Sequence, residues 1–299
     1  LFAKETKNMS KRQVAQELLC NFNTSGDTVI HPEDLTWIHG NIKDPIYRTG
    51  HDRNFWIWEK FEQNNQYLLT ADVARGDGAD NSVFHVVKLN TMEVVAEYQG
   101  KPSLDMYARI LYDAGMEFGN CLLVVENNGI GISVLEKLIN LGYPNLYYSI
   151  KSTHEFVEAV QGETMERAVA GFTTSTKTRP LIVAKLEEFI RNRMLTTYSS
   201  RIYHEMKTFI WHNGKPQAMR SYNDDLVMAL AIGCWIRDTA LQVIKREVEY
   251  QKAMINSMYK SDSTMNTAIK GMQGYNKSTT EKINEFKGEM AAFPWIYKG

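Results

Sequence analysis

The sequence has little cysteine and no long apolar run, and each shortage excludes a class of protein. Its three cysteines, Cys20, Cys121 and Cys234, lie far apart among the 299 residues, so none has the paired spacing of a zinc-binding or redox motif. We expect them to be small apolar side chains in a reducing compartment. No stretch of 18 or more apolar residues is present, so the sequence predicts no membrane-spanning helix.

An excess of charge of either sign is also missing. The formal net charge is −1, with 23% charged and 43% hydrophobic residues, so nothing global indicates a nucleic-acid partner. The chain lacks the Gly-x-x-x-x-Gly-Lys-Ser/Thr motif of P-loop ATPases, and we do not expect it to hydrolyse ATP by itself. It begins at Leu1 with neither a methionine nor a signal-peptide core, and we expect it to be the carboxy-terminal part of a longer protein.

Hydrophobic periodicity predicts an α/β domain over residues 67–240, with a mixed sheet flanked by helices. Three strands with very short connections open it as an antiparallel meander. The predicted elements are strands over 67–73, 82–89 and 92–98, a helix over 103–118, a strand over 121–125, a helix over 129–141, a strand over 146–150, a helix after Pro180, a strand over 201–211, a hairpin at 213–214 and a helix from about 224 to beyond 236.

The two ends of the chain are predicted to lie outside this domain. Residues 1–66 form an amino-terminal extension with a helix over 11–21, a short helix at 32–35 and an aromatic strand at 55–58. Residues 241–299 continue the last helix and then form a mobile tail rich in Ser, Thr, Asn, Lys and Met.

Acidic residues stand at the ends of three apolar elements. Asp72 closes a strand, Glu126 ends a run with no other charge, and Asp224 and Asp225 open the late helix. A single aspartate at a helix start needs no chemical role, because free amides favour it there, whereas a glutamate beside a buried strand is costly unless it is paired or bound to metal. Since a fold can bring a sheet edge and a helix start together, the combination predicts a divalent-metal site, and therefore an enzyme.

The strings TADVARGDGADNSVFHVV, LLVVENNGIG, GFTTSTKTRPLI and YNDDLVMALAI carry these acids. They resemble the nuclease domain of the large terminase subunit of T-even-like tailed bacteriophages, which belongs to the ribonuclease H-like superfamily. The resemblance covers residues 67–237 and extends weakly upstream, where the stretch ETKNMSKRQVAQELLCNFNTSGDTVI is similar to the segment that joins the ATPase and nuclease domains of that subunit.

The resemblance implies an endonuclease that cleaves double-stranded DNA concatemers to start and end viral genome packaging. It implies that Asp72, Glu126 and Asp225 bind two Mg²⁺ or Mn²⁺ ions, with Asp72 bridging them. Asp225 is preferred because it directly precedes the apolar run of the helix, and Asp224 remains an auxiliary or alternate ligand. The implied partners are the portal ring, the small terminase subunit and an ATPase domain, acting at the procapsid in the host cytoplasm.

Contact with DNA requires a local basic surface, and residues 176–220 hold nine Lys and Arg against three Glu. Lys177 and Arg179 lie in a Thr- and Ser-rich loop at a helix start, where amides and hydroxyls also suit phosphate. We predict DNA contact for these two residues. The other basic residues of this segment are Lys185, Arg191, Arg193, Arg201, Lys207, Lys215 and Arg220.

Other functions fit parts of the pattern. A proofreading exonuclease would have an acid at the position of Ala74, and an actin-like ATPase would need a second phosphate-binding segment, which we do not find. A Holliday-junction resolvase shares the acids, and a DNA- or procapsid-binding module with vestigial acids is the alternative without catalysis. The histidines, including His85, have no metal-ligand spacing and are predicted to be structural.

Overall fold

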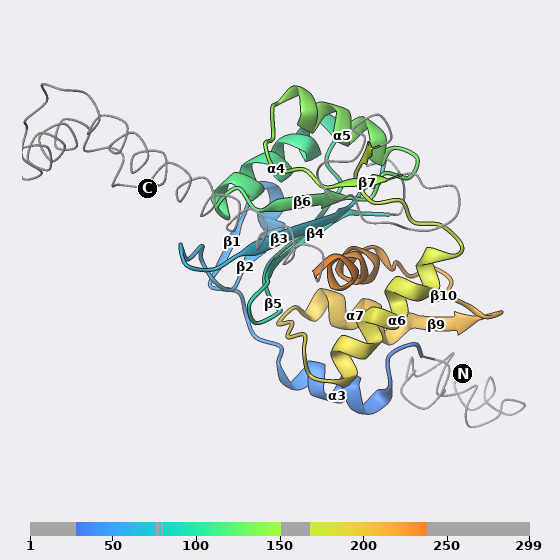
Figure 1. The fold of residues 1–299 in the computed structure, drawn as a ribbon. Coiled ribbons are helices and arrows are strands. Elements are labelled where there is room, and N and C mark those ends of the chain that lie inside the picture. The colour runs from blue at the N-terminus through green and yellow to red at the C-terminus, as the bar shows by residue number, and fades with distance from the viewer. Residues whose placement is uncertain (1–27, 76–77, 79, 151–167, 238–299) are drawn as a thin grey trace, which may run out of the picture. The chain divides into compact units, whose positions relative to one another are not determined.

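A computed structural model describes residues 28–75, 78, 80–150 and 168–237, shown in colour in Figure 1. The predicted helix over 11–21 and the predicted extension and tail over 241–299 lie outside the described residues.

The described part is built around a six-stranded mixed sheet with the order β1-β2-β5-β4-β3-β6. Neighbouring strands are antiparallel except β3 and β6, which are parallel. The predicted fold class, a mixed sheet of an antiparallel three-strand meander plus parallel strands, flanked by helices, is therefore confirmed. The strands are β1 (Tyr47–Thr49), β2 (Phe55–Ile57), β3 (Tyr67–Asp72), β4 (Ser82–Lys88), β5 (Glu93–Gly100) and β6 (Leu122–Val125).

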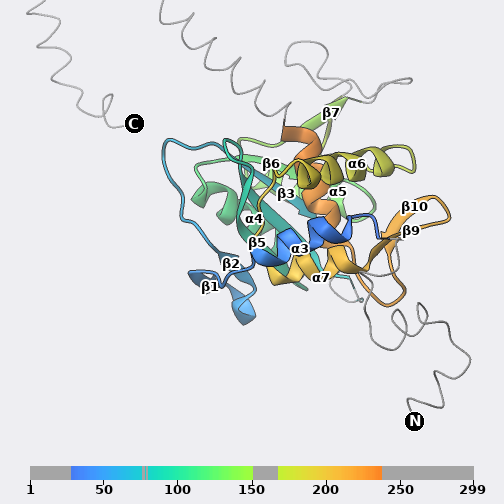
Figure 2. The ribbon, with the colours of Figure 1, turned by 90° about the horizontal axis from the view of Figure 1, so that it is seen from below.

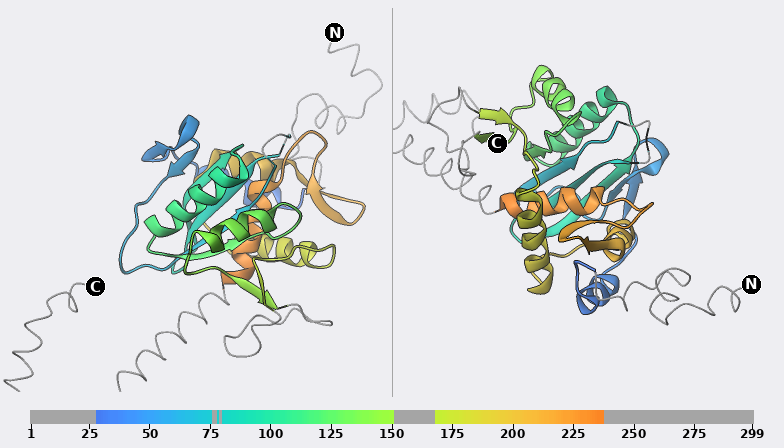
Figure 3. Two further views of the ribbon diagram at one scale, coloured as in Figure 1. Left: turned by 90° about the horizontal axis from the view of Figure 1, so that it is seen from above. Right: turned by 90° about the vertical axis from the view of Figure 1, so that its right-hand side faces the viewer.

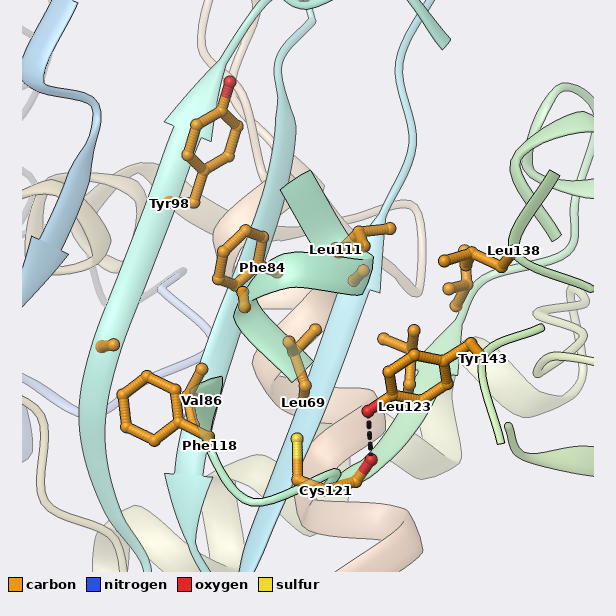
Figure 4. Packing of buried hydrophobic residues seen from close by; sticks show 14 of the residues in the cluster. Leu69, Phe84, Val86, Tyr98, Leu111, Phe118, Cys121, Leu123, Leu138 and Tyr143 are labelled. Atoms are coloured by element: carbon orange, nitrogen blue, oxygen red, sulfur yellow. Dashed lines mark hydrogen bonds between the residues drawn. The ribbon is translucent and has the colours of Figure 1, made fainter. Parts of the chain in front are cut away.

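One face of the sheet is covered by α4 (Leu104–Glu117) and α5 (Gly131–Asn140), above the sheet in Figure 1. The sheet and both helices supply alternate apolar side chains to one buried cluster, part of which appears in Figure 4. Tyr143 places its ring in this cluster and donates its hydroxyl to the Cys121 carbonyl at 2.6 Å. Cys121 and Cys234 are buried free thiols, as predicted.

The opposite face carries a helix over residues 225–237, coloured orange, with α6 (Thr178–Arg191) and α7 (Ser200–Thr208) beside it (Figures 1 and 3). This helix lies close to β3, because a Cβ atom added at Gly233 would be 3.2 Å from Thr70 Oγ1. Its buried residues include Leu226, Val227, Leu230 and Ile236. The helix is therefore packed into the interior, with Gly233 against Thr70 of the sheet.

Residues 28–66, which the sequence places in an extension, supply two strands of this sheet. β2 pairs with β5, and β1 pairs with β2 at the edge. The predicted short helix at 32–35 is the start of α3 (Pro32–Gly40), which packs against α7.

Two expectations about the second half need correction or refinement. The predicted strand over 201–211 is wrong, because 200–208 form α7 and only Phe209–His212 form a strand, β9. The buried residues Ile202, Tyr203 and Met206 follow a helical spacing, and Ser199 accepts the Arg201 amide at the helix start. β9 forms the predicted hairpin with β10 (Lys215–Ala218), seen from below in Figure 2.

The predicted strand over 146–150 is present as β7 (Tyr148–Ile150), but it pairs with β8 (Ala168–Ala170) in a separate two-stranded sheet. Within the described ranges, no helix has the length and apolar character needed to cross a membrane.

Polar side chains form a buried row beneath the helix over 225–237. Thr70, His85 and Glu97 are paired in register across β3, β4 and β5, and all three are fully buried. Ser199 donates its hydroxyl to Glu97 Oε1 at 2.6 Å. Burial raises the pKa of Glu97 to about 7 and lowers the pKa of His85 to about 4.

Glu97→Gln is expected to stabilise the protein at alkaline pH more than at acidic pH. The pKa of Glu97 is higher in the folded chain than its ordinary value of 4.5, so folding costs more as the pH rises from 4.5 through about 7. Glutamine keeps an acceptor for Ser199 and carries no charge. The gain in unfolding free energy at pH 8 should be on the order of 1–3 kcal/mol, because one pKa unit corresponds to about 1.4 kcal/mol. Urea denaturation of the wild type and the variant from pH 4.5 to 8 checks this. A difference in unfolding free energy between the two that does not change with pH contradicts it.

Candidate functional site

Two of the predicted acids end neighbouring parallel strands. Ala71 of β3 pairs with Val125 of β6. Asp72 follows Ala71, and Glu126 follows Val125. The Glu126 amide donates to the Ala71 carbonyl at 2.9 Å, which continues the ladder to the two acids. Because side chains alternate along strands, Asp72 lies on the same face as Thr70, the face covered by the helix over 225–237.

The two carboxyl groups are in direct contact. Burial, the charge of Glu126 and a hydrogen bond between the two side chains raise the pKa of Asp72 well above its usual range. The charge of Asp225 raises it further, while the Val73 amide, which donates to Asp72 Oδ1 at 2.7 Å, opposes the change. Two carboxyl groups in contact mark a position where positive charge is favoured.

Asp225 is the first residue of the helix over 225–237. The Asn81 amide donates to its Oδ2 at 2.9 Å, and Asn223 Nδ2 donates to the same oxygen at 3.2 Å. Asn81 immediately precedes β4, so this contact joins the helix start to the β3–β4 connection. Burial raises the pKa of Asp225 to about 6, and the neighbouring charges of Asp80 and Asp224 contribute.

Asp224 has different partners from Asp225. Its Oδ2 accepts an ion-pair hydrogen bond from Arg179 and a hydrogen bond of 3.2 Å from the Ala218 amide. Arg179 also donates through Nε to the Pro216 carbonyl at 3.1 Å. Asp224 therefore ties the start of the helix to α6 and β10, whereas the charge of Asp225 acts on Asp72.

Residues after β6 hold Glu126 in place. Asn128 Nδ2 donates to Glu126 Oε1 at 2.9 Å and to the Thr174 carbonyl at 2.7 Å. A Cβ atom added at Gly131 would lie 1.9 Å from the Glu126 carbonyl oxygen, so only glycine lets α5 begin this close to the acid. Asn128 was not singled out from the sequence, because its contact with Thr174 joins positions 46 residues apart.

The two residues predicted to contact DNA have unlike surroundings. Lys177 is exposed at the start of α6, where Thr178 Oγ1 accepts the Ser175 amide at 2.7 Å. Arg179 is half-buried, with its guanidinium on Asp224 and Pro216. The charge of Lys177 is therefore exposed to solvent, while Arg179 holds Asp224 at the start of the helix over 225–237.

The structure brings Asp72 and Glu126 into contact and Asp225 close enough to affect Asp72. Among the residues that the structure describes, however, no three His, Cys, Asp or Glu side chains are placed to hold one metal ion together. Asp72 is hydrogen-bonded to Glu126, and Asp225 accepts two N–H groups. A donor set made only of carboxylate oxygens nevertheless fits Mg²⁺ or Mn²⁺, once side-chain rotation replaces these hydrogen bonds.

A mixed sheet with α4 and α5 on one face and the helix over 225–237 on the other is the ribonuclease H-like fold, as it occurs in large terminase nucleases. No protein-family model matches the chain, and no curated protein matches it. Solved structures do. The large terminase nuclease of thermophilic phage G20c with bound magnesium is 17% identical, with a TM-score of 0.53 over 70% of this chain and 96% of that chain.

Two further structures of the same phage nuclease agree. With bound cobalt the TM-score is 0.52 at 17% identity, over 70% of this chain and 96% of that chain. A third structure gives 0.51 at 18% identity, over 69% and 96%. The TM-scores show that the fold is shared. At identities this low they show no more than the fold, and the T-even-like relationship remains a prediction.

Asp72→Asn is expected to stabilise the metal-free protein and remove its response to metal. Asparagine ends the repulsion between two half-buried carboxylates and can donate to Glu126. We expect a gain of about 1 kcal/mol, or roughly 2–4 °C in Tm for a domain of this size. The wild-type Tm should rise when Mn²⁺ replaces EDTA, and the variant Tm should not.

Calorimetry at pH 7.5 checks both effects, with Asp113→Asn as the control, since Asp113 is exposed and pairs with Arg109. An equal Mn²⁺ response in wild type and Asp72→Asn contradicts the assignment of Asp72 to the site.

Proposed function

We propose that this chain is the nuclease domain of a tailed-phage large terminase subunit, and that it is a metal-dependent endonuclease acting on double-stranded DNA. The observation that carries the proposal is the contact between Asp72 and Glu126 at the ends of β3 and β6, with Asp225 acting on Asp72 from the helix start. Like charges in contact at half-buried positions are costly, and a cation-dependent function is a physical reason to keep them.

Asp72, Glu126 and Asp225 would hold the metal, which we propose to be two Mg²⁺ or Mn²⁺ ions. When bound, such ions make a coordinated water more acidic and neutralise charge on the leaving oxygen of a phosphodiester. Asn128 orients Glu126, and the Asn81 amide orients Asp225. Asp224 is proposed as an auxiliary residue that, through Arg179, keeps the neighbouring acid in place.

Lys177 is proposed to contact the DNA backbone. It is exposed at the start of α6, the helix whose first turn supplies Arg179 to Asp224. The exposed positive charge of Lys177 suits a phosphate that approaches the acids. Arg179 is proposed to reach DNA only secondarily, because its guanidinium is engaged.

The proposed biological role is to cut concatemeric DNA at the beginning and end of genome packaging in a T-even-like phage. The proposed partners are the portal ring, the small terminase subunit and the ATPase domain of the same subunit. The proposed place of action is the procapsid in the host cytoplasm. These statements rest on the sequence resemblance and on the fold shared with the phage nuclease structures.

Substitution of any of the three acids is expected to abolish cleavage. Asp72→Asn, Glu126→Gln and Asp225→Asn should each lower Mn²⁺-dependent plasmid nicking by at least about 100-fold, since metal-based charge stabilisation contributes several kcal/mol. Asp224→Asn should lower it less, and Asp113→Asn should have no effect. Normal cutting by Asp72→Asn would show that the assignment is wrong.

Substrate choice separates the alternatives in the same assay. Linear and plasmid duplexes should be cut at least as well as a four-way junction. Cutting confined to the junction would indicate a resolvase, and no cutting of any DNA in Mg²⁺ or Mn²⁺ would indicate a binding module without catalysis.

Lys177→Ala is expected to weaken DNA binding uniformly across sequences. Loss of one phosphate contact should reduce the slope of log K against log salt by about 1. Lys185→Ala is the matched control, because Lys185 lies on the same helix and is paired with Glu188 at 3.2 Å. Fluorescence anisotropy at 50–200 mM salt, in EDTA to prevent cutting, provides the measurement. Identical slopes for both variants would rule out the contact.

A further inference from the structure

The start of the helix that carries Asp225 is capped by a residue from another helix. Glu205 of α7 is only 8% exposed, and its Oε2 accepts the amides of Leu226 at 2.8 Å and Val227 at 3.2 Å. The first amides of a helix have no partner inside the helix and normally bond to the residue just before it. Asp224 occupies that place, but its Oδ2 is bonded to Arg179 and to the Ala218 amide.

The same short stretch of backbone is also held from the sheet. His85 of β4 lies 3.0 Å from the Leu226 carbonyl through Nε2, and since a carbonyl can only accept, Nε2 carries the proton. Glu205 Oε1 accepts Gln99 Nε2 of β5 at 3.2 Å. Both polar backbone groups of Leu226 are therefore fixed by buried side chains that are anchored to the sheet.

This arrangement has a direct consequence for the acids. Leu226 follows Asp225, while Asp72 and Glu126 belong to the sheet to which His85 and Gln99 also belong. The capping contacts thus set the distance between the helix start and the sheet edge. Metal coordination is sensitive to ligand displacements of about 0.5 Å, so a small movement of the helix start would weaken metal binding by Asp225.

We propose that Glu205 is a positioning residue that holds Asp225 in place for metal binding. The inference rests on the proposed role of Asp225 as a metal ligand. Glu205 acts through the backbone and does not itself meet the metal, because its Oε2 is taken by two amides and its Oε1 by Gln99.

Three variants of the full chain test the inference. Glu205→Ala removes the cap. Glu205→Gln keeps it, because one amide oxygen can accept both backbone N–H groups and the Gln99 amide can turn to accept from the new NH₂ group. Asp34→Ala is the matched control: Asp34 is another buried carboxylate, paired with Arg193 at 2.7 Å on α3, and its loss destabilises the chain without touching the helix start.

Mn²⁺ binding, followed by the loss of the free-ion electron paramagnetic resonance signal, is the readout, with Tm recorded for each variant. Glu205→Ala should weaken Mn²⁺ binding about tenfold, as loss of a residue that orients a ligand does in other sites. Glu205→Gln should restore most of the affinity, and Asp34→Ala should bind Mn²⁺ as the wild type does while showing a lower Tm.

Unchanged Mn²⁺ affinity in Glu205→Ala would overturn the inference, and so would an equal loss in Asp34→Ala, which would reflect general destabilisation. Plasmid nicking is measured separately. A wild type that binds Mn²⁺ and cuts no DNA would contradict the proposed function, whereas the positioning role is decided by the Mn²⁺ binding of the variants alone.

Discussion

The candidate site is built around one unfavourable contact, that between the carboxyl groups of Asp72 and Glu126. Each acid continues a strand whose other residues are almost all buried, so neither can move far from the sheet edge. The parallel register of β3 and β6 makes the two acids neighbours. Asn128 donates a hydrogen bond to Glu126, and the helix over 225–237 places a third carboxylate, that of Asp225, close enough to act on Asp72.

Much of the sheet could be predicted from the sequence because its signals are local. Only residues 89–92 separate β4 from β5, and the uncharged run of β6 is typical of a strand covered on both faces. The prediction of a strand over 201–211 was wrong. Aromatic and branched residues favour a strand there, but the buried residues Ile202 and Met206 are four positions apart, which is the spacing of a helix. Pairing of β2 with β5 could not be derived, since sequence patterns do not identify strand partners.

Residues of the candidate site could be predicted where their position at the end of a strand or helix indicated a role. Residues whose role depends on a contact with a distant part of the chain could not be predicted. Asp72, Glu126 and Asp225 stand at element ends, which the sequence shows, and the fold brings them to one region. The roles of Arg179 and Glu205 were hidden, because the partner of Arg179 is 45 residues away and the amides that Glu205 caps are 21 and 22 residues away. A carboxylate that caps a distant helix leaves no local signal.

A crystal structure of the chain soaked in Mn²⁺ tests the central claim most directly. We expect anomalous density at the edge of β3 and β6, with oxygens of Asp72, Glu126 and Asp225 about 2.1–2.3 Å from metal and the hydrogen bond between Asp72 and Glu126 replaced. Manganese bound elsewhere, with Asp72 still bonded to Glu126 and Asp225 still bonded to Asn81, would contradict it.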